Sequence, residues 1–229
     1  MLRGASYLPE GRLCLTFDDG PGETAGAGPG PRTTALAELL ADEEVPATFF
    51  VCGSHVRRHP ESVRRALALG HDVGNHTWSH PSLTASGIDV ATQVRATDHA
   101  LRQVGAQGRL PLRPPYGDWD AAAATAAASD VAVVESTVGV FGWDVDPQDW
   151  AAWESRASAE HAAAELVAAC VRAGRGVVLL HDCSADPGER GAHLRAGNRA
   201  LESVRAAIPA LRAEGFTFAA LREVAPDRW

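Results

Sequence analysis

The chain has 229 residues, of which 45% are hydrophobic and 22% are charged, and its formal net charge is −8. A chain of this length can bury one sizeable core, and we expect residues 1–229 to form a single domain. It has no apolar run near the ~18 residues that a membrane span needs. It also lacks the dense Lys/Arg cluster of a nucleic-acid interface. We therefore expect neither a membrane nor a nucleic acid as a partner.

Short apolar or β-branched runs alternate along the chain with helical stretches rich in Ala, Leu and Arg. In the helical stretches apolar residues recur every three or four positions, as at Leu201, Val204, Ile208 and Leu211. In chain order, we expect strands at residues 13–17, 47–51, 72–76, 110–114, 131–135, 142–145, 177–181 and 217–221. We expect helices at residues 32–43, 60–69, 87–104, 119–128, 157–172 and 198–214.

Repeated strand–helix units predict an α/β fold with a parallel sheet. Seven or eight such strands indicate a TIM-like (β/α) barrel, and we expect it to be irregular because the link between 131–135 and 142–145 is too short for a helix. Segments 20–31 and 182–198 are rich in glycine, proline and charge, which predicts long loops. Each follows a strand, so both loops belong to the rim where barrel active sites lie.

Polar residues follow the predicted strands at the point where each strand ends. In chain order these are Asp18 and Asp19, His76 and His80, the sequence RPPYG, the sequence DPQDW and the sequence LLHD. Taken singly, an aspartate pair is typical of a turn or cap, a histidine pair of the surface, and RPPY of a rigid loop. Five such clusters at one end of a barrel favour a functional site instead.

The residue types at these strand ends indicate metal-assisted hydrolysis. His76 and His80, with one of the two aspartates, make a His/His/Asp set that leaves metal positions open for water and substrate. The other aspartate is then placed to act as a general base on the activated water. His181 can protonate a leaving amine or alcohol, while Arg113 keeps the base ionised and Asp149 orients the histidine and raises its pKa. This pattern predicts a hydrolase of an acyl group.

The same five clusters resemble the signature motifs of the polysaccharide deacetylases, also called carbohydrate esterase family 4 or the NodB homology domain. The motifs read TFDDG (16–20), HTWSH (76–80), RPPYG (113–117), DPQDW (146–150) and LLH (179–181), in the order of the family. They cover about residues 11–222. The resemblance implies that the whole chain is a NodB-type catalytic domain and that it carries one divalent metal ion, zinc above all, with cobalt or another ion as the alternative.

The resemblance also implies a role for each motif residue. Asp18 corresponds to the catalytic base, and Asp19, His76 and His80 correspond to the metal ligands. His181 corresponds to the general acid.

The remaining motif residues support these groups or the substrate. By the same resemblance, Arg113 tunes Asp18 and Asp149 tunes His181. Trp150 and Leu179 line the pocket for the acetyl methyl group, and the backbone N–H of Tyr116 helps the metal polarise the carbonyl oxygen.

The function expected from the residues and the resemblance is hydrolysis of the N-acetyl group of an acetylated amino sugar. The alternative is that the protein is a metal-dependent amidohydrolase, which removes the acyl group from a small, non-polymeric metabolite such as an acetylated amine. A third reading is a non-catalytic sugar-binding module. It is disfavoured because the base, the acid and their two partners are all present.

Two further features bear on where the protein works and on what it accepts. The first twelve residues contain no apolar signal region, and the four cysteines have no CxxC spacing. We therefore expect free thiols and a cytoplasmic protein, or a secreted one if a native signal was removed. Segments 20–31 and 182–198 are longer than is usual in the family. Cys183 is read as a passive loop thiol, and the six histidines outside the motifs as packing or surface residues.

Overall fold

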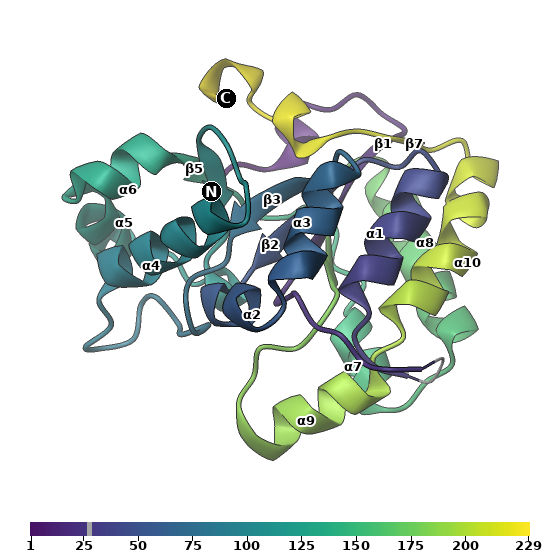
Figure 1. Ribbon diagram of the computed structural model, residues 1–229. Coiled ribbons are helices and arrows are strands. Elements are labelled where there is room, and N and C mark those ends of the chain that lie inside the picture. The colour runs from purple at the N-terminus through teal and green to yellow at the C-terminus, as the bar shows by residue number, and fades with distance from the viewer. Residues whose placement is uncertain (27–28) are drawn as a thin grey trace.

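Seven parallel strands form one curled sheet at the centre of the molecule, which we describe from a computed structural model covering residues 1–26 and 29–229 (Figure 1). The sheet order is β5-β4-β3-β2-β1-β6, with β7 paired to the start of β1. The strands are β1 (Arg12–Asp18), β2 (Ala47–Val51), β3 (Asp72–Asn75), β4 (Leu110–Leu112), β5 (Thr137–Val140), β6 (Gly176–His181) and β7 (Thr217–Phe218). This is the distorted (β/α) barrel that the sequence predicts.

Helices cover the outside of the sheet in two groups. In Figure 1, α1, α8 and α10 gather at the right of the view and α4, α5 and α6 at the left, with α3 between the two groups. The helices are α1 (Thr33–Asp42), α2 (Gly53–Arg58), α3 (Pro60–Ala68), α4 (Val90–Gln103), α5 (Ala121–Ala128), α6 (Val131–Ser136), α7 (Asp149–Glu154), α8 (Ala159–Ala173), α9 (Gly188–Gly197) and α10 (Ala200–Ala213). Within the described residues, none of these helices is long and apolar enough to cross a bilayer.

Strand β1 is buried on both faces, and its alternation decides which side chains reach the site. Leu13, Leu15 and Phe17 pack into the main core between the sheet and the helices. The alternate residues Thr16 and Asp18 are also buried and face Arg113, which donates to both side chains. Because successive strand residues point to opposite faces, the chain delivers Asp18 to the inner side of the barrel.

The gap between β5 and β6 is closed by residues 141–145 rather than by an eighth strand. The Phe141 N–H donates to the Leu112 carbonyl at 2.8 Å, and the Leu179 N–H donates to the Val145 carbonyl at 2.9 Å. Val145 forms an isolated parallel bridge with Val178. The strand expected at 142–145 is therefore wrong as a strand, but the segment lies where it was expected and joins the two sheet edges.

The strand expected at 131–135 is also wrong, because Val131–Ser136 forms helix α6. Its local cause is Asp130, whose side chain accepts a hydrogen bond from the Val133 N–H and caps the helix. The cap and the burial of Val133 outweigh the β preference of the valines. Strand β5 follows at 137–140, where no strand was expected.

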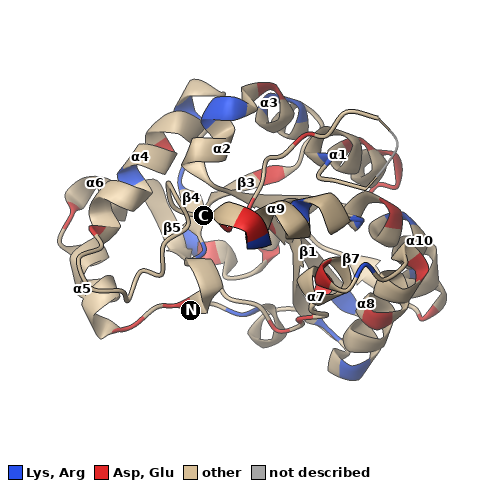
Figure 2. Ribbon diagram, turned by 90° about the horizontal axis from the view of Figure 1, so that it is seen from below, with Lys and Arg blue, Asp and Glu red and all other residues tan. Residues whose placement is uncertain are grey.

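The predicted loop at 182–198 is wrong over much of its length, since it contains helix α9. In the view from below, α9 lies over the middle of the sheet and carries both acidic and basic residues (Figure 2). The predicted loop at 20–31 has no helix or strand within the described residues, apart from one bridge between Glu23 and Arg32, and residues 27–28 lie outside that description.

Candidate active site

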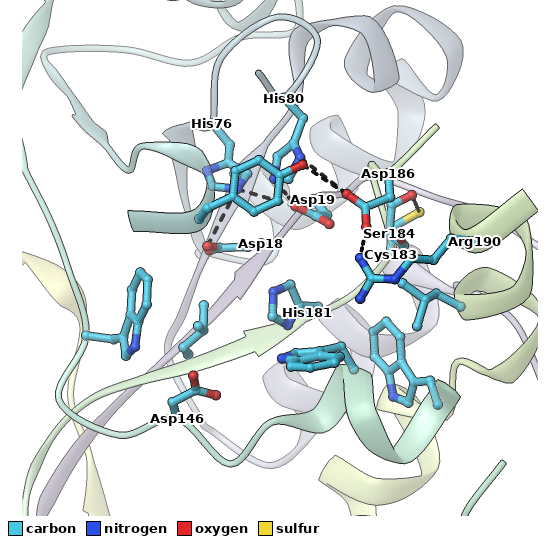
Figure 3. A pocket seen from close by; sticks show the side chains of 16 residues that line it. Asp18, Asp19, His76, His80, Asp146, His181, Cys183, Ser184, Asp186 and Arg190 are labelled. Atoms are coloured by element: carbon cyan, nitrogen blue, oxygen red, sulfur yellow. Dashed lines mark hydrogen bonds and ion pairs between the residues drawn. The ribbon is translucent and has the colours of Figure 1, made fainter. Parts of the chain in front are cut away.

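The ends of the strands enclose a cavity of about 290 Å³. Side chains from β1 and β6, and from the segments that follow β1, β3, β4, β5 and β6, point into it (Figure 3). The residues that line it are Asp18, Asp19, His76, His80, Tyr116, Trp143, Asp146, Trp150, Trp153, Leu179, His181, Cys183, Ser184, Asp186, Arg190 and Leu194. The cavity thus brings together motif residues from Asp18 to His181, which lie far apart in the chain.

Asp19, His76 and His80 converge on one point. The Nε2 atoms of His76 and His80 lie 3.3 and 3.0 Å from Oδ1 of Asp19, and all three residues are buried. Asp19 and His80 have left-handed backbones, with φ of 76° and 61°. This turn at Asp19 ends the strand alternation, so two neighbouring aspartates can enter the same cavity. Aspartate tolerates the left-handed region better than most residues.

The charges and hydrogen bonds at this point fit a bound cation. His76 Nδ1 lies 2.8 Å from the Arg113 carbonyl, to which it donates, so its Nε2 lone pair faces Asp19. Oδ1 of Asp19 is buried and receives no hydrogen bond within the described residues. Burial raises the pKa of Asp19, but the neighbouring charge of His80 outweighs burial and holds the pKa well below its usual value. Two imidazole nitrogens and a carboxylate oxygen are a donor set that suits zinc.

Asp18 is held by the buried guanidinium of Arg113. Nη1 of Arg113 donates to Oδ1 of Asp18 at 2.8 Å and to Oγ1 of Thr16 at 2.7 Å. The Arg113 side chain is 0% exposed and lies over the Phe50 ring. The other carboxylate oxygen of Asp18 lies 3.6 Å from Nε2 of His76. One oxygen is thus fixed by the arginine while the second faces His76 of the Asp/His/His set.

His181 is oriented by Asp149 at the start of α7. Its Nδ1 lies 2.8 Å from one oxygen of Asp149, and its backbone N–H donates to the other oxygen at 2.8 Å. Burial lowers the pKa of His181, but the charge of Asp149 and its hydrogen bond outweigh burial, so that the pKa rises to about 10. The raised pKa favours the imidazolium form at neutral pH, and the ring points into the cavity (Figure 3).

Apolar and aromatic side chains form the remaining wall. Trp150 and Leu179 line the cavity together with Trp143 and Trp153. Tyr116 has a left-handed backbone, with φ of 59°, and its ring stands edge-on to His80 with a centroid separation of 4.6 Å. The wall is suited to a small apolar group next to the charged residues.

The sequence matches the family model of polysaccharide deacetylase over residues 6–132, which is more than half of the chain. A chitooligosaccharide deacetylase of Sinorhizobium fredii is 37% identical over 213 residues, covering 90% of this chain and 88% of the relative. The chain belongs to the polysaccharide deacetylase family. It is accordingly a hydrolase that removes an acyl group by breaking an amide bond.

Other similar proteins support the same family assignment. The peptidoglycan-N-acetylglucosamine deacetylase PgdA of Listeria monocytogenes is 33% identical over 175 residues, covering 75% of this chain and 32% of the relative. The solved Bc1960 peptidoglycan N-acetylglucosamine deacetylase has a TM-score of 0.73 at 26% identity, with 97% of this chain and 91% of that chain covered. A family 4 carbohydrate esterase from Streptomyces lividans, solved with acetate, has a TM-score of 0.68 at 26% identity, with coverages of 94% and 95%.

Every motif residue named from the sequence lies in or directly behind the cavity of this deacetylase. Eight of the ten line it, and the other two, Arg113 and Asp149, stand behind Asp18 and His181. Cys183, read as a passive loop thiol, is buried and lines the cavity. Burial raises the pKa of the Cys183 thiol above its usual value.

Sequence reasoning missed part of the cavity wall. The missed residues include Trp143, Trp153, Asp186 and Arg190. Arg190 stands in a segment expected to be a loop, and only its helical form points it at the cavity. Trp143 and Trp153 carried a usable signal, since both lie within seven residues of motif residue Asp146 or Trp150.

Asp182 is a further carboxyl that the motifs do not explain. It is buried beside Gly20, where the side chain of any other residue would collide with it. Thr33 donates to its side chain, and burial raises the pKa of Asp182 to about 7. It joins the end of β6 to the glycine-rich segment after β1, which is a structural role.

Proposed function

We propose that the chain is a metal-dependent deacetylase that hydrolyses the N-acetyl group of an acetylated amino sugar. The observation that carries the proposal is the geometry around one cavity. An arginine-paired aspartate and an aspartate-paired histidine stand beside an Asp/His/His set. The acylated sugars named for the relatives, chitooligosaccharides and peptidoglycan N-acetylglucosamine, support the substrate class.

Asp19, His76 and His80 would hold the divalent ion, and their nitrogen-rich donor set favours zinc. When bound, such an ion polarises the substrate carbonyl and lowers the pKa of water. The buried Nδ1–H of His76 keeps that imidazole in the tautomer that offers Nε2 to the ion. The chain thus supplies His76 already oriented for the ion.

Asp18 would act as the general base. Its free oxygen faces the metal-ligand set, and Arg113 holds the other oxygen in place. A carboxylate within hydrogen-bond reach of the attacking water can take its proton as the C–O bond forms.

His181 would act as the general acid. Its raised pKa keeps a proton on the imidazole at neutral pH, and Asp149 fixes Nδ1 so that Nε2 is left for the substrate. As the C–N bond breaks, the leaving nitrogen takes this proton and departs as a neutral amine.

The acetyl methyl group would lie against Trp150 and Leu179, while the Tyr116 backbone N–H would donate to the developing oxyanion. The left-handed turn at Tyr116 and the ring contact with His80 place this backbone beside the metal ligands.

The cavity volume also supports a substrate smaller than a polysaccharide. At about 290 Å³ the cavity is near the lower end of the range for small-molecule sites. A single acetylated sugar or a small acetylated amine therefore fits better inside it than a chain of sugars, whose other units would lie outside.

The test is a substrate panel assayed for acetate release. It comprises N-acetylglucosamine, chito-oligosaccharides of increasing length, peptidoglycan fragments, acetylated xylan and small acetylated amines. Acetate from the N-acetylated sugars, with none from Asp18→Asn, is the expected result. Release from small amines alone would instead support the metabolite amidohydrolase, and no release from any substrate would support a binding module.

A further inference from the structure

Asp186 lies in the short segment between β6 and α9, outside every motif that the sequence singled out. One of its carboxylate oxygens accepts a hydrogen bond from the Tyr116 hydroxyl at 3.1 Å, and the other pairs with Nη1 of Arg190 at 2.9 Å. The carboxylate thus links the RPPYG turn on one side of the cavity to helix α9 on the other (Figure 3).

The same carboxylate faces the outer nitrogen of a metal-ligand residue. Nδ1 of His80 lies 3.9 Å from Oδ1 of Asp186, and the His80 side chain is only 7% exposed. This nitrogen has no hydrogen-bond partner within the described residues. His76, in contrast, already donates from its Nδ1 to a backbone carbonyl. A buried imidazole N–H without an acceptor is costly, and the nearest acidic side chain to it is that of Asp186.

The residue before Asp186 contacts a second metal-ligand residue. The Ala185 N–H donates to Oδ2 of Asp19 at 2.9 Å, which leaves Oδ1 directed at the two histidines. Two consecutive residues of this segment therefore stand against Asp19 and His80. The course of the segment between β6 and α9 therefore produces both contacts.

From these contacts we infer that Asp186 is a positioning residue for the metal site, accepting the Nδ1–H of His80 while Tyr116 and Arg190 hold it in place. The inference rests on the ligand assignment made under Proposed function. A carboxylate behind a ligating histidine fixes the tautomer and the ring orientation and makes the imidazole more basic. A shift of about 1 Å brings the pair from its present separation to hydrogen-bond distance. The position of α9 is thereby coupled to metal affinity.

Zinc affinity measured by competition with a chromophoric chelator tests this directly. Loss of an outer carboxylate partner weakens metal binding by about 10- to 100-fold, which is the expectation for Asp186→Ala. Asp186→Asn keeps the shape and one acceptor oxygen, so it should show a smaller loss. The matched control is Glu189→Gln, which removes the same charge from an exposed residue three positions away.

Two further readouts separate positioning from general damage. The thermal melting of each metal-free variant reports on folding. If Asp186→Ala melts at a lower temperature than the wild type, the zinc affinity of Asp186→Asn tests the inference in its place. The visible spectrum of the cobalt-loaded protein reports on ligand geometry, and it should change in the Asp186 variants but not in Glu189→Gln. Unchanged zinc affinity and an unchanged cobalt spectrum in Asp186→Ala would overturn the inference, even if activity fell. A wild-type protein that bound no metal would instead contradict the proposed function.

Discussion

At the end of β1 two neighbouring carboxylates are held by different partners, and this difference separates their proposed roles. Asp18 still has strand geometry and is paired with Arg113. Asp19 has turned into the left-handed region and faces His76 and His80. Their side chains have the same chemistry, so the backbone turn and the partners set what each one does.

Replacing Asp18 by Asn should separate catalysis from metal binding. The amide keeps the size of the side chain but cannot take a proton, so turnover should fall by about a hundredfold to ten-thousandfold. Bound metal, measured by elemental analysis, should remain at the wild-type level because Asp19 and the histidines are untouched. His80→Ala is the matched comparison, which should lose metal as well. Loss of metal from Asp18→Asn would contradict the division of roles.

The alkaline side of the pH–activity profile should depend on Asp149. In the wild type, Asp149 helps to raise the pKa of His181 to about 10, so the acid stays protonated until the pH approaches that value. Asp149→Asn removes the charge that favours the imidazolium, which lowers the pKa and moves the alkaline fall in kcat to lower pH. The profile of kcat against pH for both proteins is the measurement. An alkaline limb that does not move would mean that another group donates the proton.

Arg113 should matter for stability as much as for activity. It is completely buried and neutralises Asp18, which is itself nearly inaccessible. Breaking a buried pair by removing one partner leaves an uncompensated charge and costs about 3–5 kcal/mol. Arg113→Met should therefore lower the free energy of unfolding by that amount in denaturant melts. The double variant Arg113→Met/Asp18→Asn should recover part of the loss, and a double variant no more stable than the single one would contradict this reason.

At the scale of elements, α9 and the segment before it form one side of the cavity, through Asp186, Arg190 and Leu194. The glycines of α9 explain both why the helix packs where it does and why the sequence predicts a loop there. A side chain at Gly197 would collide with the Trp153 carbonyl of α7, and one at Gly191 with the Asp186 carbonyl. The glycines that weaken a helix in isolation are thus required for close packing here, which local propensity cannot reveal.

Other elements also differ in how far the local sequence predicts them. β1 and β2 are predictable because their residues are buried on both faces and read as continuous apolar runs. The five motifs predict which residues meet at the rim, since they follow strands that end there. Helix α6 has a local signal in the Asp130 cap, although the β preference of its valines points to a strand. The closure at 141–145 depends on contacts with β6 and is not visible in the local pattern.

The α9 side of the cavity should limit substrate length. Shortening 182–198 to a tight turn removes Arg190 and Leu194 from the wall and opens the cavity towards a longer glycan. Activity on long chito-oligosaccharides should then rise relative to activity on the monomer, measured as the ratio of kcat/KM values. Because Asp186 is removed as well, both rates are compared at saturating metal. An intact protein that already prefers four or more sugars would contradict the limit and make the segment an additional binding surface.

At the scale of the whole molecule, the barrel assembles one site from residues spread between β1 and β6. Parallel strands end at the same rim, so a pocket there can combine side chains from several strands. The sheet places β1 between β2 and β6, and Asp18 and Asp19 at its end lie close to the histidines that follow β3 and to His181. The fold therefore explains why the two aspartates are central to the proposed chemistry.

The most direct test of this account is acetate release from an N-acetylated chito-oligosaccharide by the metal-free protein before and after zinc is restored. The account predicts about one zinc ion per chain at full activity. It also predicts loss of acetate release on chelation, and recovery on adding zinc to the wild type but not to Asp18→Asn. Undiminished acetate release after stringent chelation, or full activity in Asp18→Asn, would contradict it.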